Sequence, residues 1–148
     1  AIKRVKRISS SNKSGPFMGS EFAYEDLSSF EIEKFTYKFL EENGDLLMVE
    51  QYPKGPQSGY TRRIVSYNQA KNYRIEQIEF YDRKGSLLKT LLQKDYKLYK
   101  NKFWRASEFE MVNHQTGKAT SLFFNAYDFD TKLSNEDFTQ VALKRAGN

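Results

Sequence analysis

The feature that most constrains this chain is a succession of strand-like runs joined by short turns. Four apolar and aromatic runs follow one another: Tyr73–Asp82, Leu87–Tyr99, Phe103–Gln115 and Ala119–Phe129. Each connection contains Gly or Asn, which tolerate tight turns. Because connections this short join antiparallel neighbours, we predict a continuous antiparallel meander.

The length of these runs indicates that the sheet is strongly curved. The thirteen residues Leu87–Tyr99 would span roughly 40 Å, whereas a common strand spans about 17 to 20 Å. Long strands coil, so we predict that the meander wraps into a half-barrel. Alternation within this run places Leu88 and Leu92 on the apolar side and Lys89 on the solvent side, with Leu91 as an exception.

The last two runs carry large apolar side chains on both faces. In the third run Phe109 and Met111 oppose Trp104, and in the fourth Phe123 and Tyr127 oppose their neighbours. Two interpretations fit this pattern: central strands covered by a helix, or a concave face that offers an apolar groove to a ligand.

Other elements flank the meander. A hairpin is predicted from Phe35–Leu40 and Leu46–Tyr52, because Asn43-Gly44 between them is a strong hairpin signal. Residues 53–59 contain two prolines and two glycines and indicate a loop, and Arg62–Asn68 reads as a short strand. Residues 24–28 could form a helical turn.

The C-terminal segment has the signals of a helix. Ser134 can cap it, acidic residues follow directly, and Lys144, Arg145 and Gly147 suit the other end. We therefore predict a mainly β protein of the α+β class, with short helical segments and a C-terminal helix.

Two large apolar side chains lie on a glycine-flanked turn near the N-terminus. Phe17 and Met18 follow a polar loop at 9–15. Either they plug one end of the sheet, or they form a mobile lid over a groove.

Composition limits the class of protein. Net charge is +5, with 29% charged residues and a mean hydropathy of −0.77, and no run approaches the roughly 20 apolar residues of a membrane span. The chain has no cysteine, which excludes disulfides and thiolate metal sites. Five bases precede the first acid, Glu21; they fit a lysine-protected edge strand or a docking surface: Lys3, Arg4, Lys6, Arg7 and Lys13.

Catalytic and metal-binding patterns are weak. His114 is the single histidine, and no nucleophile-elbow pattern accompanies it. Alternating acids could approach one another as a cation or glycosidase site requires, but solvated strand faces explain them: Glu108, Glu110, Asp128 and Asp130. We predict no catalytic residue, no metal and no cofactor.

One stretch resembles a known family. The sequence of residues 12–27, Asn-Lys-Ser-Gly-Pro-Phe-Met-Gly-Ser-Glu-Phe-Ala-Tyr-Glu-Asp-Leu, is similar to that of the outer-membrane lipoprotein-sorting proteins, relatives of the periplasmic carrier LolA. The basic segment 2–8, Trp104, residues 113–118 and Phe138-Thr139 fit the same pattern.

The resemblance implies a curved sheet whose apolar interior holds acyl chains of a lipoprotein or lipid in the periplasm. Residues 1–148 would be a single LolA-like domain, the C-terminal portion of a longer non-catalytic carrier that works with inner- or outer-membrane transport components. Candidate lining residues are Phe17, Met18, Trp104, Phe109, Met111, Phe123 and Tyr127. The alternative is a module that docks a protein or nucleic acid through its basic N-terminal edge, although no nucleic-acid motif is visible.

Overall fold

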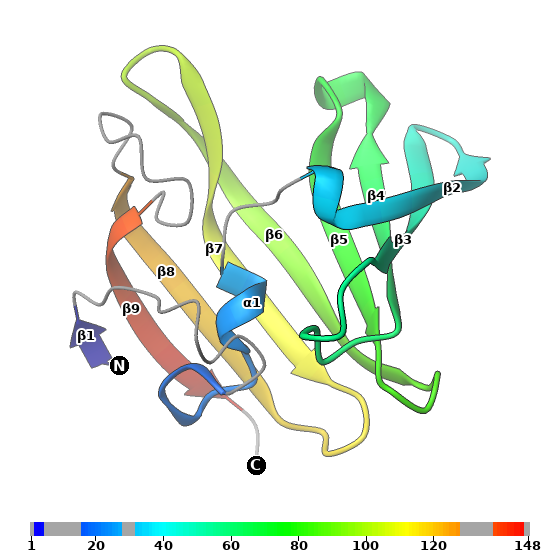
Figure 1. The fold of residues 1–148 in the computed structure, drawn as a ribbon. Coiled ribbons are helices and arrows are strands. Elements are labelled where there is room, and N and C mark those ends of the chain that lie inside the picture. The colour runs from blue at the N-terminus through cyan, green and yellow to red at the C-terminus, as the bar shows by residue number, and fades with distance from the viewer. Residues whose placement is uncertain (1, 5–15, 28–31, 128–137, 147–148) are drawn as a thin grey trace.

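The computed structural model describes the backbone of residues 2–4, 16–27, 32–127 and 138–146, and side chains at 16, 17, 19–27 and 32–124. Within these ranges, nine strands form one sheet in the order β1-β9-β8-β7-β6-β5-β4-β3-β2, and every neighbouring pair is antiparallel (Figure 1). β1 and β2 lie at its two edges, so the sheet is open.

The bounds of the strands follow the predicted meander closely. They are β1 Ile2–Arg4, β2 Phe35–Asn43, β3 Leu46–Pro53, β4 Arg62–Asn68, β5 Arg74–Tyr81, β6 Leu87–Tyr99, β7 Phe103–Asn113, β8 Ala119–Tyr127 and β9 Phe138–Ala146. The helical elements are short: η2 Phe17–Gly19, α1 Tyr24–Leu27, η3 Ile32–Lys34 and η4 Gln69–Lys71. The prediction of a mainly β, antiparallel fold is confirmed, as is the β2–β3 hairpin, where Gly44 takes a φ of 60°.

The prediction of a C-terminal helix is wrong. Phe138–Ala146 is strand β9, which pairs with β8 on one side and β1 on the other. β9 pairs with β8 along most of its length and with β1 over Val141–Leu143, and these backbone hydrogen bonds to distant segments outweigh the local helical signals. The segment also alternates, with Val141 and Leu143 two residues apart. The predicted capping residues from Ser134 to Asp137 lie outside the described residues.

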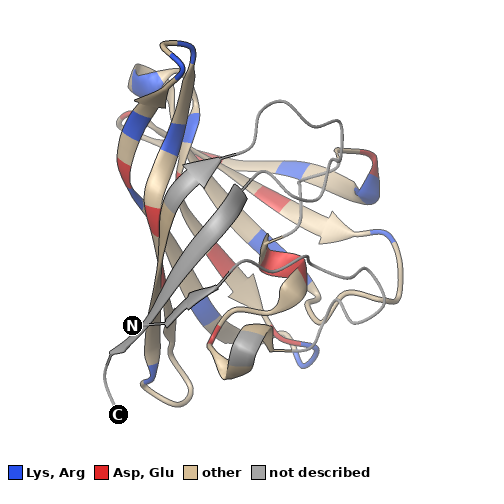
Figure 2. Cartoon of the chain, turned by 90° about the vertical axis from the view of Figure 1, so that its left-hand side faces the viewer, with Lys and Arg blue, Asp and Glu red and all other residues tan. Residues whose placement is uncertain are grey.

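The sheet is twisted and curved, and interruptions in its ladders account for part of this shape (Figures 1 and 2). The register shifts in four strand pairs, for example between Phe39 and Glu41 and between Ser66 and Tyr67. Each bulge bends its strand and increases the local twist. In β6, Asp95 takes a φ of 53° beside another break in the pairing.

The core lies on the concave side of this sheet, where α1 and the turn before it are also found (Figures 1 and 2). Buried side chains from the N-terminal segment and from five strands form one cluster: Phe17, Phe22, Leu27, Val65, Ile78, Phe80, Leu91, Met111, Leu122 and Phe124. Phe17 is 2% exposed, which agrees with a plug on the sheet.

The predicted faces of β6 are reversed in its first half. Leu91 is 1% exposed and Lys89 only 5%, and both face the core, whereas Leu92 faces the other way. A lysine reaches the core because an acid on α1 neutralises it, and nothing in the β6 sequence itself reveals that partner.

Candidate functional site

The concave face carries a row of apolar side chains that continues from strand to strand. The pairing register places directly opposite one another, from β2 to β7, Phe39, Val49, Val65, Ile78, Leu91 and Met111. We call this row the concave ladder. Because directly paired residues share a face, the ladder forms one continuous apolar strip across six strands.

The ladder has a closed half, on β4 to β7. Val65, Ile78, Leu91 and Met111 are each at most 5% exposed, in one cluster with three N-terminal side chains, Phe17, Phe22 and Leu27, which we call the plug. The plug therefore occupies the position that a ligand would need in this half.

The open half of the ladder lies on β2 and β3. Phe39 is 59% exposed, and Tyr37, two residues earlier on the same face of β2, is 42% exposed. Phe35, at the start of β2, continues this face and is half-buried. We call these three residues the aromatic row, of which Tyr37 and Phe39 are exposed. Exposed aromatic side chains in a row favour a binding surface.

Polar groups run beside the ladder where the two halves meet. Arg63 donates from Nε to Gln51 Oε1 (2.9 Å), and Gln51 donates to the hydroxyl of Tyr67 (3.0 Å). The Arg63 guanidinium also lies 4.3 Å from the centre of the Phe35 ring. Burial lowers the pKa of Arg63, and burial followed by the nearby Tyr67 raises the pKa of Tyr37. The boundary of the open half therefore combines a cation with aromatic faces.

A buried ion pair attaches α1 to the sheet. Lys89 Nζ lies 2.7 Å from Asp26 Oδ2, with side chains 6% and 0% exposed, and also donates to the Glu21 carbonyl at 2.9 Å. Asp26 accepts further hydrogen bonds from the Tyr60 hydroxyl (2.6 Å) and the Ala23 amide (2.7 Å). Burial, and then Asp26, raise the pKa of Tyr60 well above its ordinary value, so its phenol stays protonated and donates.

A second acid of α1 holds the loop that follows β3. Glu25 accepts from the Ser58 hydroxyl (2.8 Å) and from the Gly59 amide (2.7 Å). Arg83, in the β5–β6 turn, donates to the Ser58 carbonyl at 2.8 Å. The segment that carries the plug is thus attached to β6 and to the 53–59 loop by hydrogen bonds, in addition to the apolar packing of the plug itself.

The structure separates the seven predicted lining residues. Phe17 and Met111 are buried in the closed half, and Phe109 lies beside them, with its ring 4.7 Å from that of Phe124. Phe123 faces the opposite side of the sheet, where it pairs with Glu108. Trp104 is 58% exposed, far along β7 from Met111, and the side chains of Met18 and Tyr127 lie outside the description.

The aromatic row is not among the lining residues predicted from the sequence. Its signal was present, because Phe35, Tyr37 and Phe39 alternate with the polar Thr36 and Lys38. Alternation shows that the row shares a face. It does not show whether that face is covered.

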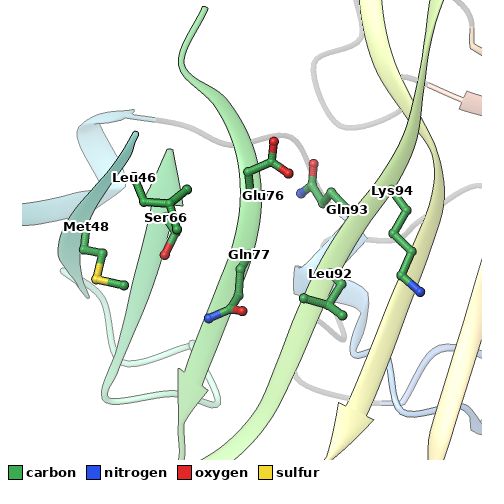
Figure 3. A pocket seen from close by; sticks show the side chains of 8 residues that line it. All are labelled: Leu46, Met48, Ser66, Glu76, Gln77, Leu92, Gln93 and Lys94. Atoms are coloured by element: carbon green, nitrogen blue, oxygen red, sulfur yellow. The ribbon is translucent and has the colours of Figure 1, made fainter. Parts of the chain in front are cut away.

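A hollow of about 400 Å³ lies on the other face of the sheet, across β3 to β6 (Figure 3). It is lined by Leu46, Met48, Ser66, Glu76, Gln77, Leu92, Gln93 and Lys94. Ser66 Oγ has no hydrogen-bond partner among the residues that the structure describes, although Ser66 is only 1% exposed. The charges at the rim are already engaged, since Lys94 contacts Glu110 at 2.9 Å and Glu76 contacts Arg74 at 2.8 Å.

Other candidates do not assemble into a reactive site. His114 Nε2 lies 2.6 Å from the Thr90 hydroxyl at an exposed position, and no metal-binding group of acids and histidines occurs among the described residues. Of the basic N-terminal residues, Lys3 and Arg4 belong to β1, and the others are not described. Within the described ranges no helix has the length and apolar character needed to cross a bilayer.

The open curved sheet, with a helical segment on its concave side, defines the LolA-like class of fold. An outer membrane lipoprotein-sorting protein domain from Vibrio parahaemolyticus is 56% identical, with a TM-score of 0.74, and the match covers 88% of this chain and 57% of that one. The fold is shared with a DUF1329 family protein from Desulfovibrio piger (24% identity, TM-score 0.68, covering 78% of this chain and 50% of that one). It is also shared with a LolA superfamily protein from Nitrosomonas europaea (18%, 0.64, covering 92% and 54%).

Residues 1–145 match a family model whose description reads "-like: Uncharacterized protein". Comparison with the curated proteins gave no match. The chain belongs to this family, and it spans between 50% and 57% of the length of these three solved proteins.

Proposed function

We propose that this chain is part of a non-catalytic periplasmic carrier that binds acyl chains of a lipoprotein or lipid on the open half of its concave face. The observation that carries the proposal is the concave ladder, which is buried from Val65 to Met111 and emerges at Phe39, 59% exposed. The identity to the Vibrio domain supports the same role.

The chemistry of the open half suits an apolar chain. Burial of each CH₂ contributes about 0.8 kcal/mol, so a strip of aromatic and aliphatic side chains can bind acyl groups without a reactive residue. The Arg63 guanidinium at the boundary can attract the polar end of the cargo, and the Tyr67 hydroxyl is hydrogen-bonded into the same network.

In this proposal, residues 1–148 form one domain, which supplies one wall of a half-barrel. The Vibrio protein is matched over 57% of its length, and its remaining part would supply further cover for the aromatic row. Transport components of the inner and outer membrane would deliver and receive the cargo.

Binding of a fluorescent fatty acid tests the proposal, with native mass spectrometry of the bacterially expressed protein as a second measurement. Phe39→Glu places a charge on the open half, and we expect affinity to fall by roughly 10- to 100-fold, because one buried Phe contributes about 1.5 to 3 kcal/mol. Tyr73→Glu is the matched control, since Tyr73 is 56% exposed in the β4–β5 connection, outside the aromatic row.

A wild-type protein that takes up neither fatty acid nor lipopeptide would contradict the proposal. Equal losses in the two variants would place the binding surface elsewhere. Melting temperature should change little in either variant, because both side chains are exposed.

A further inference from the structure

The β6–β7 hairpin projects beyond the strands that flank it. β5 pairs with β6 only as far as Leu92, and β8 pairs with β7 only from Glu108 onward, whereas β6 and β7 pair with each other up to Tyr99 and Phe103. Residues 96–106 therefore form a two-stranded ribbon, in which β6 and β7 pair with each other and with no other described strand (Figure 1).

The end of this ribbon, residues 97–105, carries only positive charge. Its four basic residues are Lys97, Lys100, Lys102 and Arg105, and no acidic residue lies among these nine positions. All four are exposed, and Figure 2 shows basic residues gathered at this tip. In the sequence, the acids that flank this stretch are Asp95, just before the ribbon, and Glu108 and Glu110 further along β7; Glu110 contacts Lys94.

Large apolar side chains accompany these charges. Leu98 and Trp104 are directly opposite one another in the pairing and are 44% and 58% exposed. Lys97 and Arg105, also directly paired, occupy the other face of the ribbon. Tyr99 and Phe103 share the basic face and are half-buried, so the tip combines exposed basic side chains with the exposed Leu98 and Trp104.

We propose that the β6–β7 tip docks on the surface of an anionic phospholipid bilayer. Trp favours the boundary between lipid headgroups and hydrocarbon, and clustered Lys and Arg attract anionic headgroups. Long basic side chains can keep their charge in the headgroup layer while Leu98 and Trp104 enter below it. Docking of this kind needs no occupancy of the concave face, so it stands apart from the proposed carrier role.

Docking on a bilayer would also explain the exposure of Trp104, which a position in the predicted groove does not explain. Trp104 lies on the projecting ribbon and not among the concave residues beside Met111. It meets a bilayer from the outside of the protein.

Trp104 is the single tryptophan of the chain, so its fluorescence reports the tip directly. With vesicles of phosphatidylglycerol and phosphatidylcholine we expect a blue shift of the emission and quenching by brominated lipid. Vesicles of phosphatidylcholine alone should give neither. Binding should weaken with ionic strength as screening increases.

Charge reversal supplies the decisive comparison. Lys97→Glu, Lys100→Glu and Lys102→Glu together should lower vesicle partitioning by roughly 100-fold or more, because each base near the surface accounts for about fivefold. The matched control reverses three exposed lysines elsewhere and changes the net charge equally: Lys54→Glu, Lys71→Glu and Lys84→Glu. The control should keep most of the binding, and circular dichroism checks that both variants fold.

Leu98→Ala with Trp104→Ala, followed by vesicle co-sedimentation, tests the apolar contribution and should also reduce partitioning. No blue shift with anionic vesicles, or equal losses in the two triple variants, would overturn the proposal. Equally tight binding to soluble heparin without a blue shift would also overturn it and indicate a polyanion partner. Phe39→Glu should dock normally, which separates this result from the carrier test.

Discussion

The closed and open halves of the concave face differ in cover more than in composition. Both belong to the same ladder, yet Leu91 in the closed half is 1% exposed and Phe39 in the open half is 59% exposed. The difference comes from the plug, which packs on β4 to β8 and leaves β2 uncovered. One apolar strip can thus stabilise the fold at one end and offer a binding surface at the other.

The largest expected effect comes from truncating one Phe in each half. Phe22 is 0% exposed, so Phe22→Ala should lower the free energy of unfolding by about 3 to 5 kcal/mol. Phe39→Ala should change it by about 0.5 kcal/mol or less. Urea unfolding measures both values, and the milder Phe22→Leu keeps the comparison available if Phe22→Ala does not fold. Similar losses at the two positions would show that the halves do not differ as described.

A somewhat smaller effect is expected from the ion pair that holds the plug. Lys89→Met leaves the Asp26 carboxylate buried without its cation, and we expect a loss of about 3 kcal/mol. Lys89→Met combined with Asp26→Asn should lose less than the sum of the single changes, since the two groups are in contact. Additive losses in a double-mutant cycle would mean that the pair contributes nothing as a pair.

The smallest effect concerns the hollow on the other face of β3 to β6. Ser66→Ala removes a buried hydroxyl that has no hydrogen-bond partner in the described part of the chain, so stability should stay constant or rise slightly. Ser107→Ala is the matched control, because Ser107 Oγ donates to the Asp95 carbonyl at 2.7 Å and its loss should cost about 1 kcal/mol. Thermal unfolding compares the two, and a clear loss at Ser66 would indicate a bridging water or ligand in the hollow.

Local sequence signals were sufficient for most of the sheet. Short turns and long alternating runs predicted β2 to β8, and β6 was placed at Leu87–Tyr99 as observed. Local signals for a helix were wrong at β9. The strand forms there because segments distant in the sequence, β1 and β8, pair with it.

The candidate site could be predicted from the sequence less fully than the sheet. Apolar side chains on both faces of β7 and β8 fitted either a covered strand or an open groove. In the structure Met111 of β7 is covered, whereas the exposed end of the same ladder is Phe39 of β2. Lys89 was placed on the solvent side because its partner, Asp26, lies 63 positions away. Periodicity identifies which residues share a face, but the choice between buried and accessible depends on contacts between distant segments.

Helix α1 has only four residues, too few to be stable alone, and its two acids attach it to separate parts of the fold. Loss of either attachment would therefore also weaken the other. Amide protons of α1 and of the 53–59 loop should exchange with solvent as one cooperative unit, ahead of the central strands. The order of opening in this molecule would then begin where the closed half meets the open one.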